Sequence, residues 1–194
     1  MQRAKRCHVC WSVAVLLALV TANIARSEAV PLTPAQGTVQ VAFTPWDDAE
    51  SLLLDALAQA QREILVQAYL LTSRAIATSL IAAKQRGLHV SVLADAHQHE
   101  DNPASLLASL AEKGIPVWLE TRYRNAHNKI MVIDDGTQDA VIVTGSYNFT
   151  RSAQRMNSEN LFLVRGNLAL ARRFKQNWER HRADAVAFRP AGSQ

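Results

Sequence analysis

Two short polar segments in the C-terminal half of the chain carry residues that could do chemistry together. The first contains His127 and Lys129, and the second contains Ser146 and Asn148. Residues two apart in an extended chain lie on the same face, so each pair projects together at the end of a predicted strand. The set suits a phosphodiester, because an ammonium and an amide bind phosphate oxygens while an imidazole attacks phosphorus or transfers protons.

The two pairs belong to neighbouring predicted strands at residues 129–133 and 140–144. The segment between them contains Asp135-Gly136, and Asp-Gly is a strong hairpin signal. A hairpin brings the two pairs close to each other at one end of a sheet. The sequence therefore predicts one site built from both segments.

The elements that must position this site alternate along the chain. Further strands are predicted at residues 39–43, 64–71, 90–94, 116–119 and 160–164, and helices at 47–60, 73–86, from 102 or 105 to 113, and 168–182. The runs at 64–71 and 90–94 are mostly apolar, which is typical of parallel strands buried on both faces. We expect one α/β domain at residues 38–190, with a mixed β-sheet between helices, parallel βα units first and the hairpin later. Trp46 and Trp178 are expected in its core.

The N-terminal residues 1–29 have the pattern of a bacterial signal peptide. Basic residues precede an apolar run at 13–20, and small residues lead to a cleavage site after Ala29, with Ala22 as the alternative. The run is too short for a membrane-spanning helix, although an uncleaved anchor remains the alternative. Both cysteines, Cys7 and Cys10, would be removed. We expect a linker at residues 30–37 and a periplasmic or secreted protein without stable membrane association.

Charge is distributed unevenly along the 194 residues. The formal net charge is +4 and the sequence pI is about 9.4, but four basic residues fall in the predicted signal peptide. Residues 30–121 hold 5 basic and 10 acidic residues, whereas residues 122–194 hold 12 basic and 6 acidic residues. The basic part contains both polar pairs, which favours an anionic polymer bound through its phosphates.

The combined motif resembles the signature of the phospholipase D superfamily, H-x-K-x4-D followed by G-S-x-N. The matching residues are His127, Lys129, Asp134, Gly145, Ser146 and Asn148. A later Asn-Ser-Glu-Asn run at 157–160 makes the chain most similar to small bacterial Nuc-type endonucleases with one motif per chain. The resemblance implies a phospholipase D/Nuc-like fold and hydrolysis of DNA, with RNA left open, through a phosphohistidine. It implies no metal and no cofactor.

The same resemblance implies a role for each residue of the site. His127 would be the nucleophile, Lys129 and Asn148 would bind the phosphate, and Ser146 would support them. Glu159 would accept a hydrogen bond from the far nitrogen of His127. Two motif positions are expected to be structural: Gly145, and Asp134, which by strand parity points away from the site and is expected to form an ion pair.

The mechanism needs a second histidine to protonate the leaving oxygen. No other histidine lies in an H-x-K context, so we expect a two-fold homodimer in which His127 of each subunit meets the other across the axis. Four arginines are candidate phosphate contacts, or alternatively charged turns: Arg122, Arg124, Arg151 and Arg155.

Alternatives to the endonuclease remain at this point. A phospholipase D-type hydrolase of phosphatidyl lipids would use identical chemistry, and a non-catalytic nucleic-acid-binding module would use only the basic surface. His97 and His99 fit either a metal site or a solvated loop. The sequence also leaves open any strand or sequence preference and the biological purpose.

Overall fold

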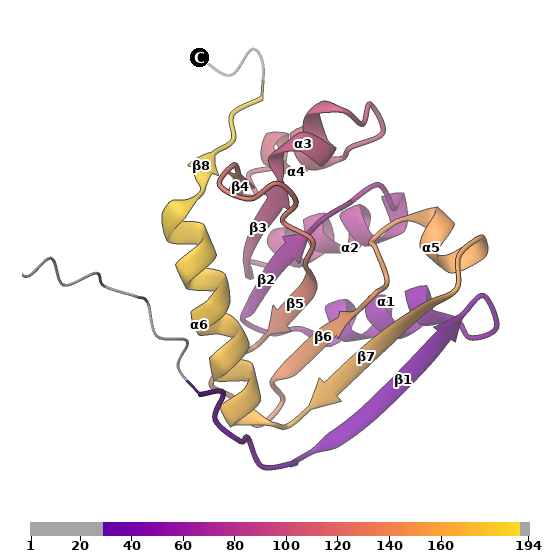
Figure 1. The fold of residues 1–194 in the computed structure, drawn as a ribbon, viewed down its shortest axis with the longest axis vertical. Helices are drawn as coiled ribbons and strands as arrows, with labels where there is room; N and C mark the ends of the chain where they lie inside the picture. The colour runs from indigo at the N-terminus through magenta and orange to yellow at the C-terminus, as the bar shows by residue number, and fades with distance from the viewer. Residues whose placement is uncertain (1–28, 191–194) are drawn as a thin grey trace, which may run out of the picture. The chain divides into compact units, whose positions relative to one another are not determined.

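The computed structural model describes residues 29–190, and the residues from Thr33 onward form one compact unit. Most of the predicted signal peptide, including Ala22 and both cysteines, lies outside the described residues. The compact unit is a mixed β-sheet with helices on both faces (Figure 1), which confirms the predicted fold class. No helix within residues 29–190 is long and apolar enough to cross a membrane.

The sheet has eight strands in the order β1-β7-β6-β5-β2-β3-β4-β8. Their bounds are β1 (Thr38–Thr44), β2 (Glu63–Ala68), β3 (His89–Asp95), β4 (Val117–Glu120), β5 (Lys129–Ile133), β6 (Val141–Gly145), β7 (Glu159–Arg165) and β8 (Val186–Ala187). The pairs β2–β3 and β3–β4 are parallel, and every other neighbouring pair is antiparallel. The predicted order, with parallel βα units first and the β5–β6 hairpin later, is confirmed.

Six helices flank the sheet within the described residues. They are α1 (Ala49–Gln59), α2 (Arg74–Gln85), α3 (Ala96–Glu100), α4 (Leu107–Glu112), α5 (Arg151–Arg155) and α6 (Leu168–Asp184). The N-terminus of α1 is capped by Asp48 and that of α2 by Ser73, each through a side-chain oxygen that accepts a backbone N–H. These caps fix where each helix leaves its preceding strand.

The two faces of the sheet are covered to different extents. Helices α1, α2 and α4 pack on one face and form the main apolar core with residues such as Leu53, Leu80 and Met131. Helix α6 crosses the other face (Figure 1), where Trp178 packs on Leu65 and its indole N–H donates to the carbonyl of Val66. This second face is covered only in part.

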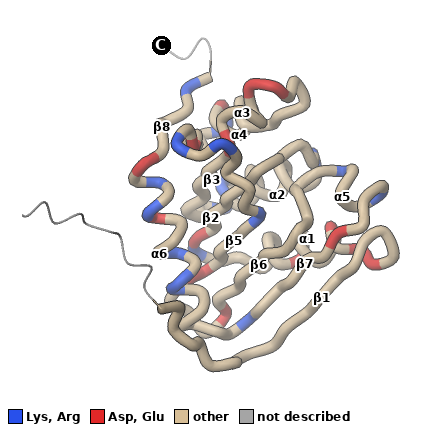
Figure 2. Tube along the Cα trace, viewed as in Figure 1, with Lys and Arg blue, Asp and Glu red and all other residues tan. Residues whose placement is uncertain are grey.

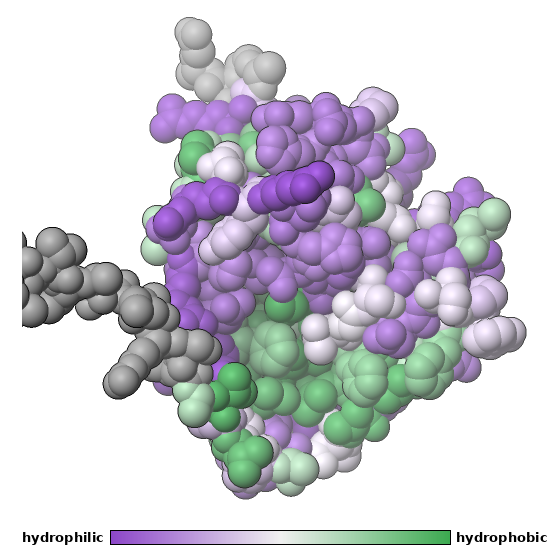
Figure 3. Space-filling model, viewed as in Figure 1, coloured by the Kyte–Doolittle hydropathy of each residue, from purple (hydrophilic) through white to green (hydrophobic). Residues whose placement is uncertain are grey.

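The part of that face on β1 and β7 is open and apolar. Four large side chains are exposed there: Val39, Val41, Phe43 and Phe162. Alternation along β1 puts the first three on one face, and Phe162 lies opposite Val41 in the antiparallel register. We call these four residues the open apolar face; Figure 3 shows apolar surface over this side of the molecule.

Several local predictions were wrong. Strand β2 ends at Ala68, three residues early, and the chain then turns so that Leu71 bridges Phe149. Residues 96–100, expected as a polar loop, form α3. Trp46 is 81% exposed instead of buried, whereas Trp178 is in the core as predicted. Helix α5 and the short strand β8 were not predicted.

Candidate active site

His127 and Lys129 lie where the loop of residues 121–128 enters β5. The His127 ring is exposed, and its centroid lies 4.3 Å from that of Tyr69. Lys129 is buried; its Nζ donates to the carbonyl of His127 at 3.0 Å and lies 4.6 Å from the centroid of the Tyr69 ring. The two predicted residues therefore share one aromatic neighbour, which holds them on the same side.

The loop that carries His127 is held at its end by a buried carboxylate. Asp95 is the last residue of β3, and its side chain accepts the backbone N–H of Ala126 at 2.6 Å and that of Gln98 at 2.8 Å. Ala126 directly precedes His127. Asp95 thus ties the nucleophile candidate to the end of a central parallel strand.

The second polar segment forms a hydrogen-bonded group around Glu159. Ser146 Oγ donates to Glu159 Oε2 at 2.6 Å, and Asn157 Nδ2 donates to Glu159 Oε1 at 2.9 Å. Ser146 Oγ also accepts the backbone N–H of Asn160 at 3.0 Å. These bonds join the end of β6 to the start of β7.

Gly145 permits this close approach of the two strands. Its φ is +140°, and a Cβ at this position would lie 2.3 Å from the carbonyl oxygen of Asn160. A side chain cannot be accommodated there without moving the backbone. The motif glycine is therefore structural, and it determines where Ser146 lies.

Asn148 is half-buried and incompletely paired. Its Oδ1 is buried and accepts no hydrogen bond from the described residues. Buried polar atoms are usually paired, and an amide can present either its oxygen or its nitrogen after a half-turn. Asn148 therefore has capacity to bind a further polar group such as a phosphate oxygen.

The electrostatics of the site favour a neutral His127 beside a charged Lys129. Burial lowers the pKa of Lys129 to about 8, and burial together with the Lys129 charge lowers the pKa of His127. The Glu159 carboxylate opposes both shifts. Near neutral pH, His127 is accordingly available as a neutral nucleophile while Lys129 still carries its charge.

Glu159 differs from its predicted role. It was expected to accept a hydrogen bond from the far nitrogen of His127, but within the described chain its two oxygens accept from Ser146 and Asn157. Its influence on His127 is electrostatic. The expectation was wrong because sequence spacing does not reveal which of several nearby donors a carboxylate meets.

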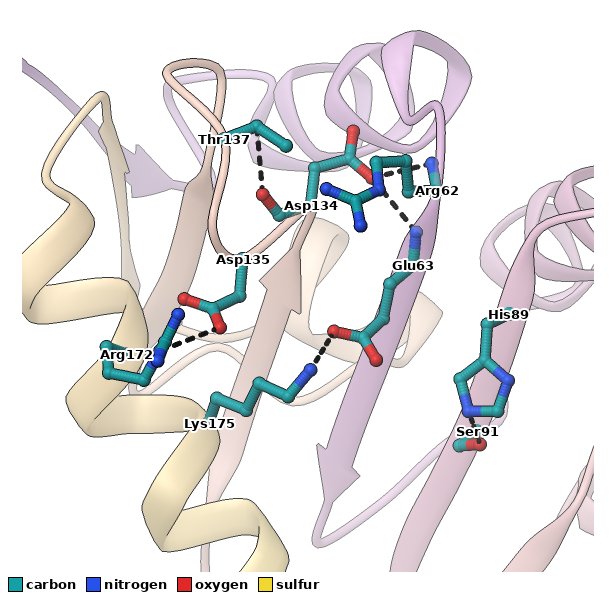
Figure 4. Close-up of polar contacts among 9 residues, drawn as sticks. All are labelled: Arg62, Glu63, His89, Ser91, Asp134, Asp135, Thr137, Arg172 and Lys175. Carbon is teal, nitrogen blue, oxygen red and sulfur yellow. Dashed lines mark hydrogen bonds and ion pairs between the residues drawn. The ribbon is translucent and has the colours of Figure 1, made fainter.

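Asp134 also has partners other than those predicted. Its carboxylate accepts the backbone N–H groups of Gln61, Arg62 and Glu63 at 2.8, 2.8 and 2.9 Å (Figure 4). No ion pair of Asp134 occurs within residues 29–190. A structural role fits this arrangement, but the carboxylate binds the amides at the start of β2 instead of a cation.

The four candidate arginines surround the site unevenly. Arg122 forms an ion pair with Asp184 of α6 at 2.5 Å, so its guanidinium is already engaged. Arg124, Arg151 and Arg155 are exposed, and no ion pair of theirs occurs in the described part of the chain. The last two lie on α5, which starts three residues after Asn148.

His97 and His99 do not form a metal cluster. His99 Nδ1 lies 2.8 Å from Ser105 Oγ, and its ring packs edge-on against Phe188, while His97 is exposed. Among residues 29–190 no group of three or more potential metal ligands comes together. His99 therefore serves a packing contact, and His97 lies on the surface of α3.

Two residues of the site were missed in the sequence. Asp95 ends a buried parallel strand, and a carboxylate at that edge is a recognisable signal, because the ends of neighbouring parallel strands meet there. Tyr69 follows β2, and nothing in its sequence context indicates that its ring will contact His127. Only the pairing of β2 with β5 brings it there.

The fold and site define a class of protein: an α/β protein with an exposed histidine and a buried lysine at one end of the central strand β5 of a mixed sheet. A family model described as "Cardiolipin synthase, PLD-like domain" matches residues 53–182, which include every residue of the site discussed above. The chain belongs to the phospholipase D superfamily, as its motif predicted.

Individual relatives agree with this assignment. A "Phospholipase D" of Rickettsia prowazekii is 32% identical over 167 residues, covering 80% of this chain and 78% of the relative. A "Mitochondrial cardiolipin hydrolase" of Xenopus laevis is 29% identical, covering 74% and 68%. The crystal structure of Nuc from Salmonella typhimurium, a phospholipase D family member, superposes with a TM-score of 0.74 at 30% identity, covering 79% of this chain and 99% of Nuc.

Proposed function

We propose that the chain is an exported phosphodiesterase that hydrolyses DNA, and acts without a metal ion. The observation that carries the proposal is the pairing of an exposed His127, its pKa lowered, with the buried ammonium of Lys129. His127 attacks phosphorus and the P–O bond to the leaving group breaks; a second histidine protonates the leaving oxygen. Water then attacks the phosphohistidine, gives its proton to that second histidine, and releases His127.

An extended polymer suits the surroundings of His127. The His127 ring is exposed at the surface beside Tyr69, where a long substrate can reach it. The exposed Arg124, Arg151 and Arg155 lie on the segments next to the motif residues, and Figure 2 shows basic residues at α5. These features support a substrate that crosses an open surface and is held through its phosphates.

The second histidine is proposed to come from a second copy of the chain. The open apolar face supports this, because large exposed apolar patches mark interfaces. It is continuous with the site: Phe43 pairs with Asn160 and Thr44 with Glu159, so the apolar side chains begin next to the Ser146–Glu159 group. A copy docked there by a two-fold axis would approach the His127 edge.

Hydrolysis of phosphatidyl lipids is the second candidate. It is favoured by the names of the relatives, a phospholipase D and a cardiolipin hydrolase, and by the same open apolar face, which could meet a lipid surface. The chemistry at His127 would be unchanged. DNA is preferred because the exposed cations next to the motif are arginines, the side chains that bind phosphates bidentately.

One experiment separates these functions. Purified protein lacking residues 1–29 is incubated with plasmid DNA in EDTA, next to a His127→Ala variant, and both are assayed on phosphatidylcholine and cardiolipin vesicles. We expect DNA nicking in EDTA that the variant lacks. Lipid turnover without nicking would establish the second candidate, and DNA binding without turnover of either substrate would leave a binding module.

The dimer is tested by a charge on the open apolar face. Val41→Asp places a carboxylate opposite Phe162 and should give an inactive monomer by light scattering. Replacement of the exposed Gln40 by Asp, on the other face of the same strand, is the matched control and should remain dimeric. An active monomer of either protein at assay concentration would exclude the shared site.

A further inference from the structure

A buried carboxylate outside the reaction scheme lies at the start of the loop that carries His127. Glu120 is the last residue of β4 and is 2% exposed. Its Oε1 lies 2.5 Å from Nδ1 of His181, and Gln67 Nε2 donates to its two oxygens at 3.3 and 3.1 Å. A buried carboxylate is tolerated only with such partners, so this arrangement is specific.

His181 connects this carboxylate to the loop through a second contact. It lies in the last turn of α6, and its ring centroid is 5.3 Å from that of Tyr123, with the two planes inclined by 34°. One residue earlier, Arg122 pairs with Asp184, also on α6. The first half of the loop is therefore held against the C-terminal end of α6.

The second half of the same loop is held by β3. Asp95 and Glu120 are register partners at the ends of the parallel strands β3 and β4, and Asp95 accepts the N–H of Ala126. The first half of residues 121–128 is thus held through His181, which pairs with Glu120, and the second half directly by Asp95. His127 directly follows Ala126, so the loop held at these two points leads straight into the nucleophile candidate.

We infer that Glu120 and His181 form a positioning pair that holds the 121–128 loop, and with it His127, in the geometry for attack on phosphorus. The inference rests on the proposed function, because it assigns His127 as the nucleophile. Neither residue is placed on the reacting atoms; both act through Tyr123 and the loop backbone. A misplacement of about 1 Å in a reacting group can cost roughly 100-fold in rate, so the effect belongs in kcat.

The main test compares two replacements of His181. His181→Phe keeps a ring next to Tyr123 but removes the donor to Glu120, and should lower kcat roughly tenfold with KM changed less than about twofold. His181→Asn can present an amide N–H at the place of Nδ1, and should recover most of the lost kcat. Glu120→Gln keeps the shape of the side chain and removes its charge, so its kcat should lie between those of the two His181 variants. It replaces His181→Phe in the test if that variant does not fold.

Lys175→Gln is the matched control on the same helix. Lys175 Nζ pairs with Glu63 at 2.6 Å at the start of β2 (Figure 4). The other end of β2, Ala68, pairs with Lys129, so this contact lies at the end of the sheet away from His127. Its removal should lower the stability of the α6 contact and leave kcat unchanged. An equal fall of kcat in this control would show that α6 acts only through overall stability, and would overturn the inference.

Hydrogen exchange gives a readout that does not depend on activity. The amides of residues 121–128, above all that of Ala126, should exchange faster in His181→Phe than in the wild-type chain and the Lys175→Gln control. Unchanged exchange there together with unchanged kcat would reduce the pair to a structural contact and overturn the inference. If the wild-type chain cleaves neither DNA nor lipid, the proposed function fails, and exchange alone decides whether the pair holds the loop.

Discussion

Strand β5 has a charged residue of the same motif at each end, and the two charges differ in the hydrogen bonds that they form with the rest of the chain. Asp134 follows the strand, and its carboxylate is met by three backbone N–H groups. Lys129 begins the strand, and its buried ammonium has one carbonyl and one aromatic ring as neighbours. The Asp134 charge therefore stabilises the fold, whereas the Lys129 charge can still bind an anion.

The physical basis of this difference is the cost of burying a charge. A buried ion destabilises the protein unless hydrogen bonds compensate for the lost water. Compensation is thorough at Asp134, where three donors converge. It is incomplete at Lys129, and the deficit is visible as a pKa lowered to about 8. Asn148, with its unpaired Oδ1, lies in the segment next to the incomplete end.

The largest expected effect comes from His127, two residues before the Lys129 end of β5. His127→Ala should reduce kcat by at least about 1000-fold, because the covalent route is lost. Its unfolding midpoint should stay near that of the wild type, since the ring is exposed. DNA cleavage measures kcat, and thermal unfolding measures the midpoint. His97 is exposed on α3, so His97→Ala is the control and should change neither kcat nor the midpoint. A strongly destabilised His127→Ala would break the contrast with Asp134.

Lys129→Met should lose activity without losing stability at neutral pH. We expect a fall in kcat/KM on the order of 100-fold, as for other removed charge stabilisers of a transition state. Folding lowers the Lys129 pKa from 10.5 to about 8, so the folded chain binds fewer protons than the unfolded chain between these values. Wild-type stability should therefore rise with pH through this window relative to Lys129→Met.

Urea unfolding of both proteins below pH 8 and above pH 10 measures this difference. A Lys129→Met variant that is clearly less stable than the wild type at neutral pH would show that the ammonium is part of the framework after all. The comparison between the two ends of β5 would then fail.

Asp134→Ala should show the opposite behaviour. Three backbone donors lose their acceptor, and the free energy of unfolding should fall by about 3 kcal/mol. Asp134→Asn keeps one amide oxygen and tolerates the φ of +52°, so it should lose less. Asp139→Asn, exposed in the same turn, is the control. Activity per folded molecule should be retained, and a loss of kcat at native stability would contradict the structural role.

The pH profile of cleavage tests whether the Lys129 charge binds the phosphate. kcat/KM should fall as pH rises through about 8, because Lys129 then loses the charge that binds phosphate. Lys129→Arg stays charged at these pH values, so whatever activity it retains should not fall there. The measurement is kcat/KM on plasmid DNA across neutral and alkaline pH. A wild-type profile that is flat through pH 8 would disagree with the assigned role of Lys129.

The smallest effects are expected at the arginines. Arg124→Gln and Arg151→Gln should each weaken DNA binding a few-fold and reduce the slope of log K against log salt by about 1. Arg122→Gln should reduce this slope less, because that guanidinium is paired with Asp184. Binding to a DNA duplex over a range of salt concentrations checks the order. If the slope of every variant equals that of the wild type, these arginines do not contact DNA.

Much of the fold could be predicted because its signals are local. Apolar runs predict β2 and β3, Ser73 caps α2 as expected, and the Asp-Gly turn predicts the β5–β6 hairpin. The motif residues allow the family assignment for the same reason: their types and spacing can be identified in the sequence without knowledge of the fold. The exposure of Trp46 could not be predicted, since burial depends on residues distant in sequence. Helix α3 was missed although its N-cap is local: the Asp95 side chain accepts the Gln98 N–H.

By itself, the sequence determined the superfamily, the mixed sheet and the residues that carry the chemistry, because periodicity and motif spacing are properties of neighbouring residues. The tertiary structure alone decided that Asp134 binds three amides, that Glu159 meets Ser146 and Asn157, and that Tyr69 contacts both His127 and Lys129. It also revealed that His181 reaches Glu120 from a helix 61 residues away. Hydrogen-bond partners and burial are set by strand order and helix docking, and these are long-range properties that no local pattern encodes.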